Sequence, residues 1–251
     1  MTAFDKIPLH KSLLTGLVLS VAFLSACAVP VDRSDNDPTE IANREVFEFN
    51  RRLDKAVIRP VGVVAGTLTP DPVRAGVDNM VKNLDTPGYV VNGLLQGRLE
   101  NAFSNVFRFG INSTLGVAGI FDPATDFGFP LKETDFGETM HVWGAGEGRY
   151  LVVPVLGPTT ERDLAGKVVD TLMNPTRAFV SADHKDIVTG LKVAETVYDR
   201  YDYLDVIDDA LYGSADPYAQ ARLAYLQNRN HLLGIDSSDD YIDPYEDPYA
   251  E

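Results

Sequence analysis

Residues 108–163 read RFGINSTLGVAGIFDPATDFGFPLKETDFGETMHVWGAGEGRYLVVPVLGPTTERD, and the rest of the chain is organised around them. This segment holds nine of the twenty glycines and the only tryptophan, among many Phe, Leu and Val residues. Glycine permits tight turns and close backbone contact, and aromatic side chains supply large apolar areas. Such a composition fits neither a regular helix nor a regular strand. It predicts an irregular apolar centre with ordinary amphipathic helices on its flanks.

The whole chain has 251 residues, an apolar content of 45% and a formal net charge of −15. This length suits one domain, or at most two small ones, and the apolar content suffices for a core. The negative charge argues against nucleic-acid binding, which needs a basic surface, and against electrostatic adsorption to an anionic bilayer. Any membrane contact is therefore expected to be apolar or covalent.

Residues 1–26 have the pattern of a lipoprotein signal peptide. Two lysines precede the apolar run 13–24, which is too short to span a bilayer. Residues 24–27, LSAC, match a bacterial lipobox, so we expect a covalent lipid on Cys27. Ala28 then favours the outer membrane over inner-membrane retention. The alternative is a plain secretory signal with an incidental cysteine. No second cysteine exists for an intramolecular disulfide.

Amphipathic helices are predicted along most of the remaining chain. The first starts at Asp37-Pro38, with Asp37 as its N-cap. Its predicted buried stripe is Ala42, Val46, Phe49, Leu53, Ala56 and Val57. Phe47 lies off this stripe, and burial under a neighbouring helix is favoured over contact with lipid. Further helices are expected between 70 and 84, 89–96, 98–115, 159–172, 183–211 and 217–234, with an apolar connection at 60–69.

The predicted helix 98–115 is apolar on nearly all sides, although several Arg and Asn residues interrupt it. Such a helix is either fully buried or in contact with lipid. One interpretation is a central core helix, and the other is a helix with one side on protein and one on acyl chains. Phe103, Phe107 and Phe109 are therefore candidates for acyl contact, with core packing as the alternative.

No strand ladder is apparent, and the fold is predicted to be mostly α-helical. The domain boundaries expected are a signal peptide at 1–26, a lipidated tether at 27–37, a helical domain at 38–234 and a tail at 235–251. The tail carries seven acidic residues and no basic one, so it is expected to be disordered.

The sequence contains no recognisable catalytic or metal-binding set. The histidines at 10, 141, 184 and 231 lack metal-ligand spacing, and there is no G-x-S-x-G elbow. His141, beside Trp143, is expected to be packed or hydrogen-bonded rather than a general base. The GAGEG run at 144–148 is similar to a nucleotide loop but lacks its context and any P-loop lysine. We therefore predict neither an enzyme nor a cofactor or metal site.

Several segments, in this order, resemble the MlaA (VacJ) family of Gram-negative lipoproteins. They are LSAC (24–27), DPTEIANREVFEFNRRLD (37–54), NLDTPGYVVNGLLQG (83–97), RFGINSTLGVAGIFDPAT (108–125), DFGETMHVWGAGEGRYLVVPVLGPTTERDLAG (135–166) and VVDTLMNP (168–175). The resemblance covers about residues 37–212. It departs at residues 39–41, Thr-Glu-Ile, where the family often has an aromatic residue, Glu and Pro.

The resemblance implies an all-α, ring-like or irregular multi-helix domain with a central amphipathic channel and a Gly-rich hairpin-like loop. Such a protein lies lipid-anchored at the periplasmic side of the outer membrane, usually with a trimeric porin. It removes phospholipids mislocalised in the outer leaflet and passes them to a periplasmic lipid-carrier protein. Phospholipid is then the transported ligand, and no cofactor is needed.

The resemblance also assigns roles to individual residues. Gly144, Gly146 and Gly148 would form a hinge loop beside the channel, whereas a simple tight turn is the alternative. Phe47, Phe49 and Asn50 match a motif whose perturbation disturbs gating, although Phe49 is equally suited to a core. Two other functions stay open on the residues alone, a scaffold lipoprotein that moves no lipid and an envelope hydrolase.

Overall fold

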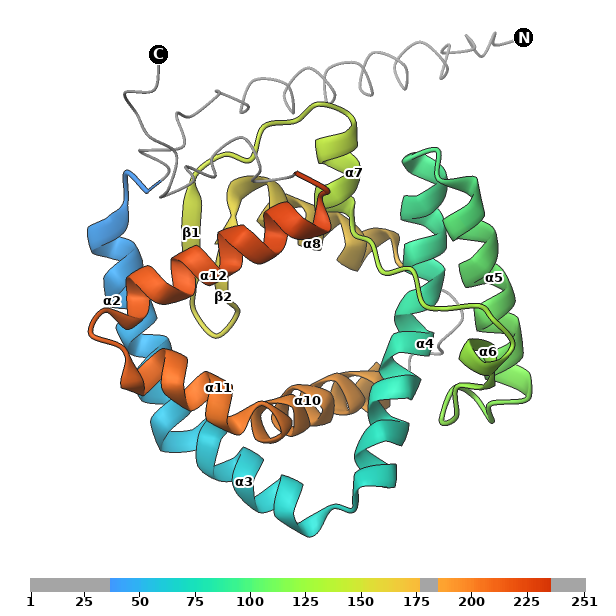
Figure 1. Ribbon diagram of the computed structural model, residues 1–251, viewed down its shortest axis with the longest axis horizontal. Helices are drawn as coiled ribbons and strands as arrows, with labels where there is room; N and C mark the ends of the chain where they lie inside the picture. The colour runs from blue at the N-terminus through green and yellow to red at the C-terminus, as the bar shows by residue number, and fades with distance from the viewer. Residues whose placement is uncertain (1–36, 177–184, 236–251) are drawn as a thin grey trace, which may run out of the picture.

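The computed structural model describes residues 37–176 and 185–235, and most of this part is helical (Figure 1). Its elements, in chain order, are α2 (Glu40–Leu53), the π-helical segment η2 (Asp54–Ile58), α3 (Arg59–Leu68), α4 (Asp71–Leu95), α5 (Leu99–Thr114), α6 (Pro123–Asp126), α7 (Phe136–Val142), β1 (Tyr150–Val153), β2 (Gly157–Thr160), α8 (Glu161–Met173), α10 (Lys185–Asp202), α11 (Leu204–Asp208), the π-helical segment η4 (Asp209–Gly213) and α12 (Pro217–Leu232).

These elements follow one another around a ring (Figure 1). Helices α2 and α3 form one arc and α4 the opposite one, while α10 packs against both α3 and α4. The hairpin β1–β2, α8 and α12 complete the ring, and α5 with α6 lies outside it against α4. This arrangement confirms the predicted all-α, ring-like single domain, apart from one small hairpin.

The hairpin corrects the expectation that no strand ladder exists. Strands β1 and β2 pair antiparallel, with Val153 opposite Gly157. Each strand has four residues, too few for an alternating pattern to be recognised, and Pro158 in β2 suggested a helix start. Since the outer edge of β1 bonds to side chains of α2, this pair does not depend on further strands.

Two prolines do not end helices where the sequence predicted that they would. The apolar connection expected at 60–69 is helical, because α2 continues through η2 into α3 and Pro60 falls in the first turn of α3. The chain is helical on both sides of Pro60, so the hydrogen bond lost at proline falls inside a continuous helix, next to the π-helical turn of η2. Helix α4 likewise runs through Pro87 from Asp71 to Leu95 as one helix of 25 residues. Its tertiary contacts outweigh the hydrogen bond lost at proline.

Other helix ends agree with the sequence more closely. Helix α5 is confirmed, and α8 begins with Thr160, whose hydroxyl accepts from the Asp163 N–H. Asp216 caps α12 by accepting from the Ala219 N–H, and Gly234 follows that helix with φ of 67°. The expected helix 183–211 is instead divided among α10, α11 and η4. Asp37 does not cap α2, whose N-cap residue is Thr39.

Polar and apolar side chains are distributed in an unusual way. Within the described residues, seven hydrophobic and sixteen polar or charged side chains are buried, whereas thirty-two large hydrophobic ones are exposed. The apolar core of Phe47, Tyr150, Val152 and Tyr218 is small and lies where α2, β1 and α12 meet. Water-soluble domains show the reverse preference, because Ile, Val, Leu and Phe are usually inside. In the described part of the chain, no helix is long and apolar enough to cross a membrane.

Candidate functional site

The buried face of α5 is polar. Asn105, Arg108 and Asn112 recur at helical spacing and are nearly inaccessible to solvent. The Arg108 guanidinium donates to the Thr125 hydroxyl at 2.8 Å and to the Phe129 carbonyl at 2.9 Å, and it pairs with Asp122. These residues fasten the irregular segment after α5 to the helix.

Two asparagines of α5 bind backbone groups of the segment that follows the helix, and Asn112 also donates to the Asp122 carboxylate at 2.9 Å. Asn105 donates to the Lys132 carbonyl at 2.8 Å and accepts from the Lys132 N–H at 3.2 Å. Asn112 accepts from the Ala124 N–H at 3.0 Å. A side-chain amide can replace a strand neighbour in this way, because it carries one donor group and one acceptor. The chain between 122 and 132 therefore needs no regular secondary structure to be satisfied.

The apolar face of α5 points away from the protein. Phe103 and Phe107 are 59% and 55% exposed, and Phe109 is exposed as well. Phe107 stacks on Phe129, with ring centroids 5.4 Å apart, and this pair does not bury it. The interpretation of α5 as a central core helix is therefore wrong, since its polar residues are the ones that contact protein. The observed helix has one side on protein and an open apolar side.

Helix α2 repeats this pattern. Its buried residues are Asn43 and Phe47, whereas Phe49 is half exposed. Phe47 was expected to lie beneath a neighbouring helix, and it packs edge-on against Tyr218 of α12 with centroids 5.7 Å apart. The predicted buried stripe through Phe49 and Val57 instead faces outward. It continues along α3 through exposed Val61, Val64 and Leu68.

Two asparagines of α2, seven residues apart, hold the hairpin. Asn43 donates to the Tyr150 carbonyl at 3.1 Å and accepts from the Val152 N–H at 3.0 Å. Asn50 donates to the Val153 carbonyl at 3.0 Å and accepts from the Val155 N–H at 2.8 Å. Asn43 thus binds the strand, and Asn50 binds the turn at its tip.

The turn of the hairpin is strained and apolar. Val155 has φ of 69°, a left-handed conformation that is unfavourable for a β-branched residue. Val155 and Leu156 are both largely exposed. Unfavourable backbone geometry persists only where surrounding contacts enforce it, and Asn50 supplies two such contacts.

The three glycines of the GAGEG run have separate roles. Gly144, with φ of 88°, ends α7 in a Schellman motif, in which its own N–H donates to His141 O and the Ala145 N–H to Met140 O. Gly148, with φ of 74°, lies where an added Cβ would be 2.8 Å from Glu161. Gly146 is exposed and has no left-handed φ. The hairpin itself is formed by residues 150–160, not by this run.

A buried ion network joins two parts of the ring. Arg200 of α10 binds Asp54 through both carboxylate oxygens, at 2.8 and 2.9 Å, and also pairs with Asp208. The Tyr212 hydroxyl donates to Asp54 at 2.8 Å. The network therefore connects η2, which begins at Asp54, with η4, which follows Asp208.

Comparison with known proteins agrees with these observations. The sequence model of the MlaA lipoprotein family matches residues 35–232. The chain belongs to the MlaA family. It is similar to the "Intermembrane phospholipid transport system lipoprotein MlaA" of Escherichia coli (strain K12), with 31% identity over 96% of this chain and 95% of the relative. The corresponding protein of Haemophilus influenzae is 31% identical over 87% of this chain and 88% of its own.

An uncharacterised protein of Rickettsia felis is 38% identical over 75% of this chain and 74% of its own. A solved structure described as "Structural basis for maintenance of bacterial outer membrane lipid asymmetry" superimposes with a TM-score of 0.69 and 32% identity. The superposition covers 78% of this chain and 98% of the chain in the solved structure. The ring is therefore the fold of the MlaA family.

For this MlaA-family fold the sequence predicts neither a catalytic nor a metal-binding group. No cluster of His, Cys, Asp and Glu suitable for a metal occurs among them. Burial lowers the pKa of His141, and the positive charge of Arg162 lowers it further. Burial would raise the pKa of Asp122, but hydrogen bonds from Thr125, Asn112 and Arg108 together lower it. Cys27 lies outside the described residues.

The structure brings the predicted residues into two places rather than one. Phe47 and Asn50 meet the hairpin and α12, whereas Phe103, Phe107 and Phe109 lie on the outer side of α5. Sequence reasoning included Asn50 but missed the buried Asn43, Asn105 and Asn112. Their spacing was a usable signal, because Asn43 and Asn50 are separated by seven residues, as are Asn105 and Asn112. This spacing returns a side chain to the same helix face after two turns.

Proposed function

We propose that this chain is an outer-membrane lipoprotein, anchored through Cys27 at the periplasmic side, that lies in one leaflet and removes mislocalised phospholipids from the other. The lipid passes through the ring to a periplasmic lipid-carrier protein, and a trimeric porin accompanies the ring. The names of the E. coli and H. influenzae relatives support phospholipid transport. The observation that carries the proposal is the large apolar surface that the described residues expose.

That surface suits hydrocarbon rather than water. Each exposed apolar Å² in water costs about 25 cal/mol, so thirty-two large exposed side chains would strongly favour aggregation or membrane insertion. Helices satisfy their own backbone groups, which allows them to face acyl chains. The polar side chains on the inner face of α5 are buried and bonded to residues 122–132.

Helix α3 has the dimensions of an insertion into one leaflet. Residues 60–70 carry no charge, and the ten residues of α3 rise about 15 Å, half of a hydrocarbon core of about 30 Å. Gly62 and Gly66 face α10, where added Cβ atoms would lie 3.2 Å from Val197 O and 2.0 Å from the Tyr201 ring. Small residues four apart are typical of helix contacts within membranes.

The position of Trp143, at another part of the ring, also supports contact with the membrane. Its ring is 58% exposed beside exposed Leu94, Leu95 and Val142, and its indole N–H donates to Leu95 O at 3.1 Å. An apolar ring with its polar group satisfied is suited to the boundary between headgroups and hydrocarbon. A lipid on Cys27 would add about 0.8 kcal/mol per buried CH₂, without any basic surface.

The site residues enter the proposal with different roles. Phe49, Phe103, Phe107 and Phe109 contact acyl chains. Asn50 fixes the apolar hairpin tip, and Phe47 supports it from the core. Gly144, Gly146 and Gly148 allow the segment between α7 and β1 to adjust as lipid passes. No cofactor is required, because no bond is made or broken.

Photocrosslinking in intact cells tests this function. A photoreactive residue at Phe107 or at exposed Gly146 should capture labelled phospholipid, whereas one at exposed Gln220 should not. Phospholipid should also remain bound to the unacylated protein after purification. If the protein captures no phospholipid, and a strain that lacks the protein keeps a normal outer leaflet, the protein is a scaffold. Lipid-ester turnover that is lost on His141→Ala would instead show a hydrolase.

A further inference from the structure

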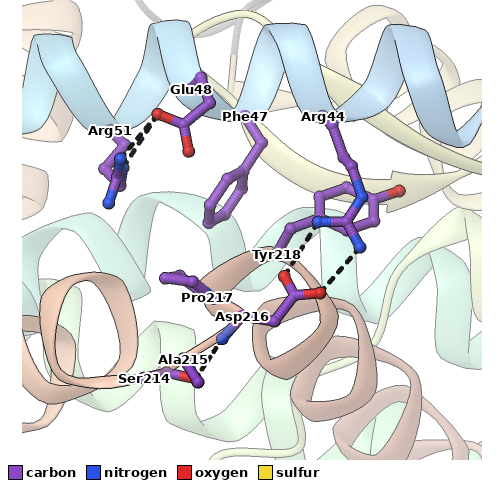
Figure 2. A pocket seen from close by; sticks show the side chains of 9 residues that line it. All are labelled: Arg44, Phe47, Glu48, Arg51, Ser214, Ala215, Asp216, Pro217 and Tyr218. Atoms are coloured by element: carbon purple, nitrogen blue, oxygen red, sulfur yellow. Dashed lines mark hydrogen bonds and ion pairs between the residues drawn. The ribbon is translucent and has the colours of Figure 1, made fainter.

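A cleft lined by both polar and apolar side chains separates α2 from the start of α12 (Figure 2). Its volume is about 490 Å³, within the range of about 300–1,000 Å³ typical of small-molecule sites. Its lining comes from two segments, residues 44–51 of α2 and residues 214–218 between η4 and α12. Phe47 and Tyr218 are buried side chains of the lining and pack edge to face against each other.

One end of the cleft is closed by a completed ion pair. Arg44 binds both oxygens of Asp216, at 2.9 and 2.8 Å, and its Nε donates to Glu40 at 2.7 Å. The guanidinium also lies 4.3 Å from the centroid of the Tyr218 ring. The hydrogen bond from Arg44 lowers the pKa of Asp216 to about 2, so this pair stays ionised at neutral pH. Its groups are fully used within the protein.

The other end presents polar groups that are only partly used. Nε and Nη2 of Arg51 both donate to one oxygen of Glu48, at 3.1 and 2.8 Å. Among the described residues, Nη1 of Arg51 and Oε1 of Glu48 make no hydrogen bond. Across the cleft, the Ser214 oxygen accepts from the Asp216 N–H, which leaves the hydroxyl hydrogen available. A guanidinium, a hydroxyl and a carboxylate oxygen thus remain for a ligand.

These groups match a zwitterionic ligand, which carries one negative and one positive group. A guanidinium and a hydroxyl donate to phosphate oxygens, whereas a carboxylate accepts from an ammonium group. The cleft contains two arginines and two acidic residues, so its side chains carry no net charge. A ligand that also has no net charge keeps the occupied cleft neutral. We propose that this cleft binds the headgroup of a zwitterionic phospholipid, with Arg51 and Ser214 on the phosphate and Glu48 on the amine. This proposal rests on the lipid-transport function proposed above.

The test measures binding by the full-length protein in detergent. Dihexanoyl phosphatidylethanolamine and dihexanoyl phosphatidylglycerol are titrated in parallel, together with glycerophosphoethanolamine and inorganic phosphate. Arg51→Gln should weaken phosphatidylethanolamine binding about tenfold or more. Glu48→Gln should weaken phosphatidylethanolamine by a similar factor but leave phosphatidylglycerol unchanged or strengthen it. Unchanged circular dichroism and Tm verify folding.

Arg52→Gln is the matched control, because Arg52 is exposed on the same helix and does not line the cleft. It should bind both lipids as the wild type does. The proposal is overturned if Arg51→Gln binds phosphatidylethanolamine normally, or if Arg52→Gln weakens it equally. It is also overturned if inorganic phosphate binds as tightly as the lipid, which describes a plain anion site. A wild-type protein that binds no phospholipid would overturn the proposed function as well.

Discussion

Asparagine side chains hold irregular segments against helices in this protein, whereas hydrophobic contacts do so in most domains. Asn43 and Asn50 fasten the hairpin to α2, and Asn105 and Asn112 fasten the segment after α5. Each bonds to backbone, so it satisfies groups that a nonaqueous environment would leave unpaired. A lost amide leaves a buried donor or acceptor without a partner, which costs about 1–3 kcal/mol.

Removal of the Asn50 side chain should release the tip of the hairpin. In Asn50→Ala the Val155 N–H loses its acceptor at 2.8 Å, and the strained backbone of Val155 is free to relax. Hydrogen exchange at residues 153–157 should accelerate about tenfold. Asn112→Ala is the control, since it should affect residues 122–124 alone. Unchanged exchange at the tip in Asn50→Ala would contradict this role.

Glu195 should make stability depend on pH. Burial and the negative charges of Asp199 on its own helix and of Asp78 and Asp85 on α4 together raise the pKa of Glu195 to about 7, although the positive charge of Lys192 opposes the shift. A carboxyl with a raised folded-state pKa stabilises the fold below its unfolded value of 4.5, and this stability is lost as pH rises towards 7.

Glu195→Gln should therefore increase Tm at pH 8 by roughly 2 °C, because glutamine carries no charge to repel its acidic neighbours. At pH 5 the gain should be smaller, since the folded wild type is already protonated there. Thermal unfolding of both proteins between pH 5 and 8 measures the difference. An equal gain at both pH values would show that Glu195 is ionised throughout this range.

At the scale of elements, the contact between α3 and α10 depends on glycine. An added Cβ on Gly66 would lie 2.0 Å from Cγ of Tyr201, close to the fixed end of that ring. Gly66→Ala should therefore push the helices apart and destabilise the protein by about 1–3 kcal/mol. Denaturation in detergent measures this change.

Gly110→Ala provides the comparison, because Gly110 also lies within a helix and has no atom within 4 Å of an added Cβ. Alanine favours helix over glycine by about 0.8–1 kcal/mol, so this variant should be slightly stabilised. Equal effects of the two substitutions would mean that helix propensity, rather than the α3–α10 contact, determines the outcome.

The elements were predictable where capping residues control them. Asp216 before α12 and Asn174-Pro175 after α8 act locally, so their effects could be recognised without tertiary information. Pro60 and Pro87 were misjudged, because proline ends a helix only if the surrounding fold does not compensate. The hairpin depends on asparagines more than a hundred residues away, which no local pattern includes.

At the scale of the whole molecule, helical periodicity led to the wrong face of α2 being placed in the interior, and it left the apolar face of α5 undecided between core and lipid. Helical periodicity identified an apolar stripe through Phe49 correctly, but the usual assumption places such a stripe against a core. Here Phe49 and Phe103 are exposed while Asn43 and Arg108 are buried. Periodicity separates the two faces of a helix; the solvent around the protein decides which one faces outward.

The exposed apolar face of α3 should lie in hydrocarbon. Val64 is 59% exposed at the middle of the uncharged segment 60–70. An Asp there costs up to about 3 kcal/mol if the helix lies in hydrocarbon, whereas it costs little if the helix faces water. Val64→Asp should therefore reduce flotation of the unacylated Cys27→Ala protein with phospholipid vesicles about tenfold or more. Gln220→Glu adds the same charge at an exposed polar position of α12 and should float normally. Normal flotation of Val64→Asp would mean that α3 does not enter the bilayer, and then the apolar surface would have to be covered by protein.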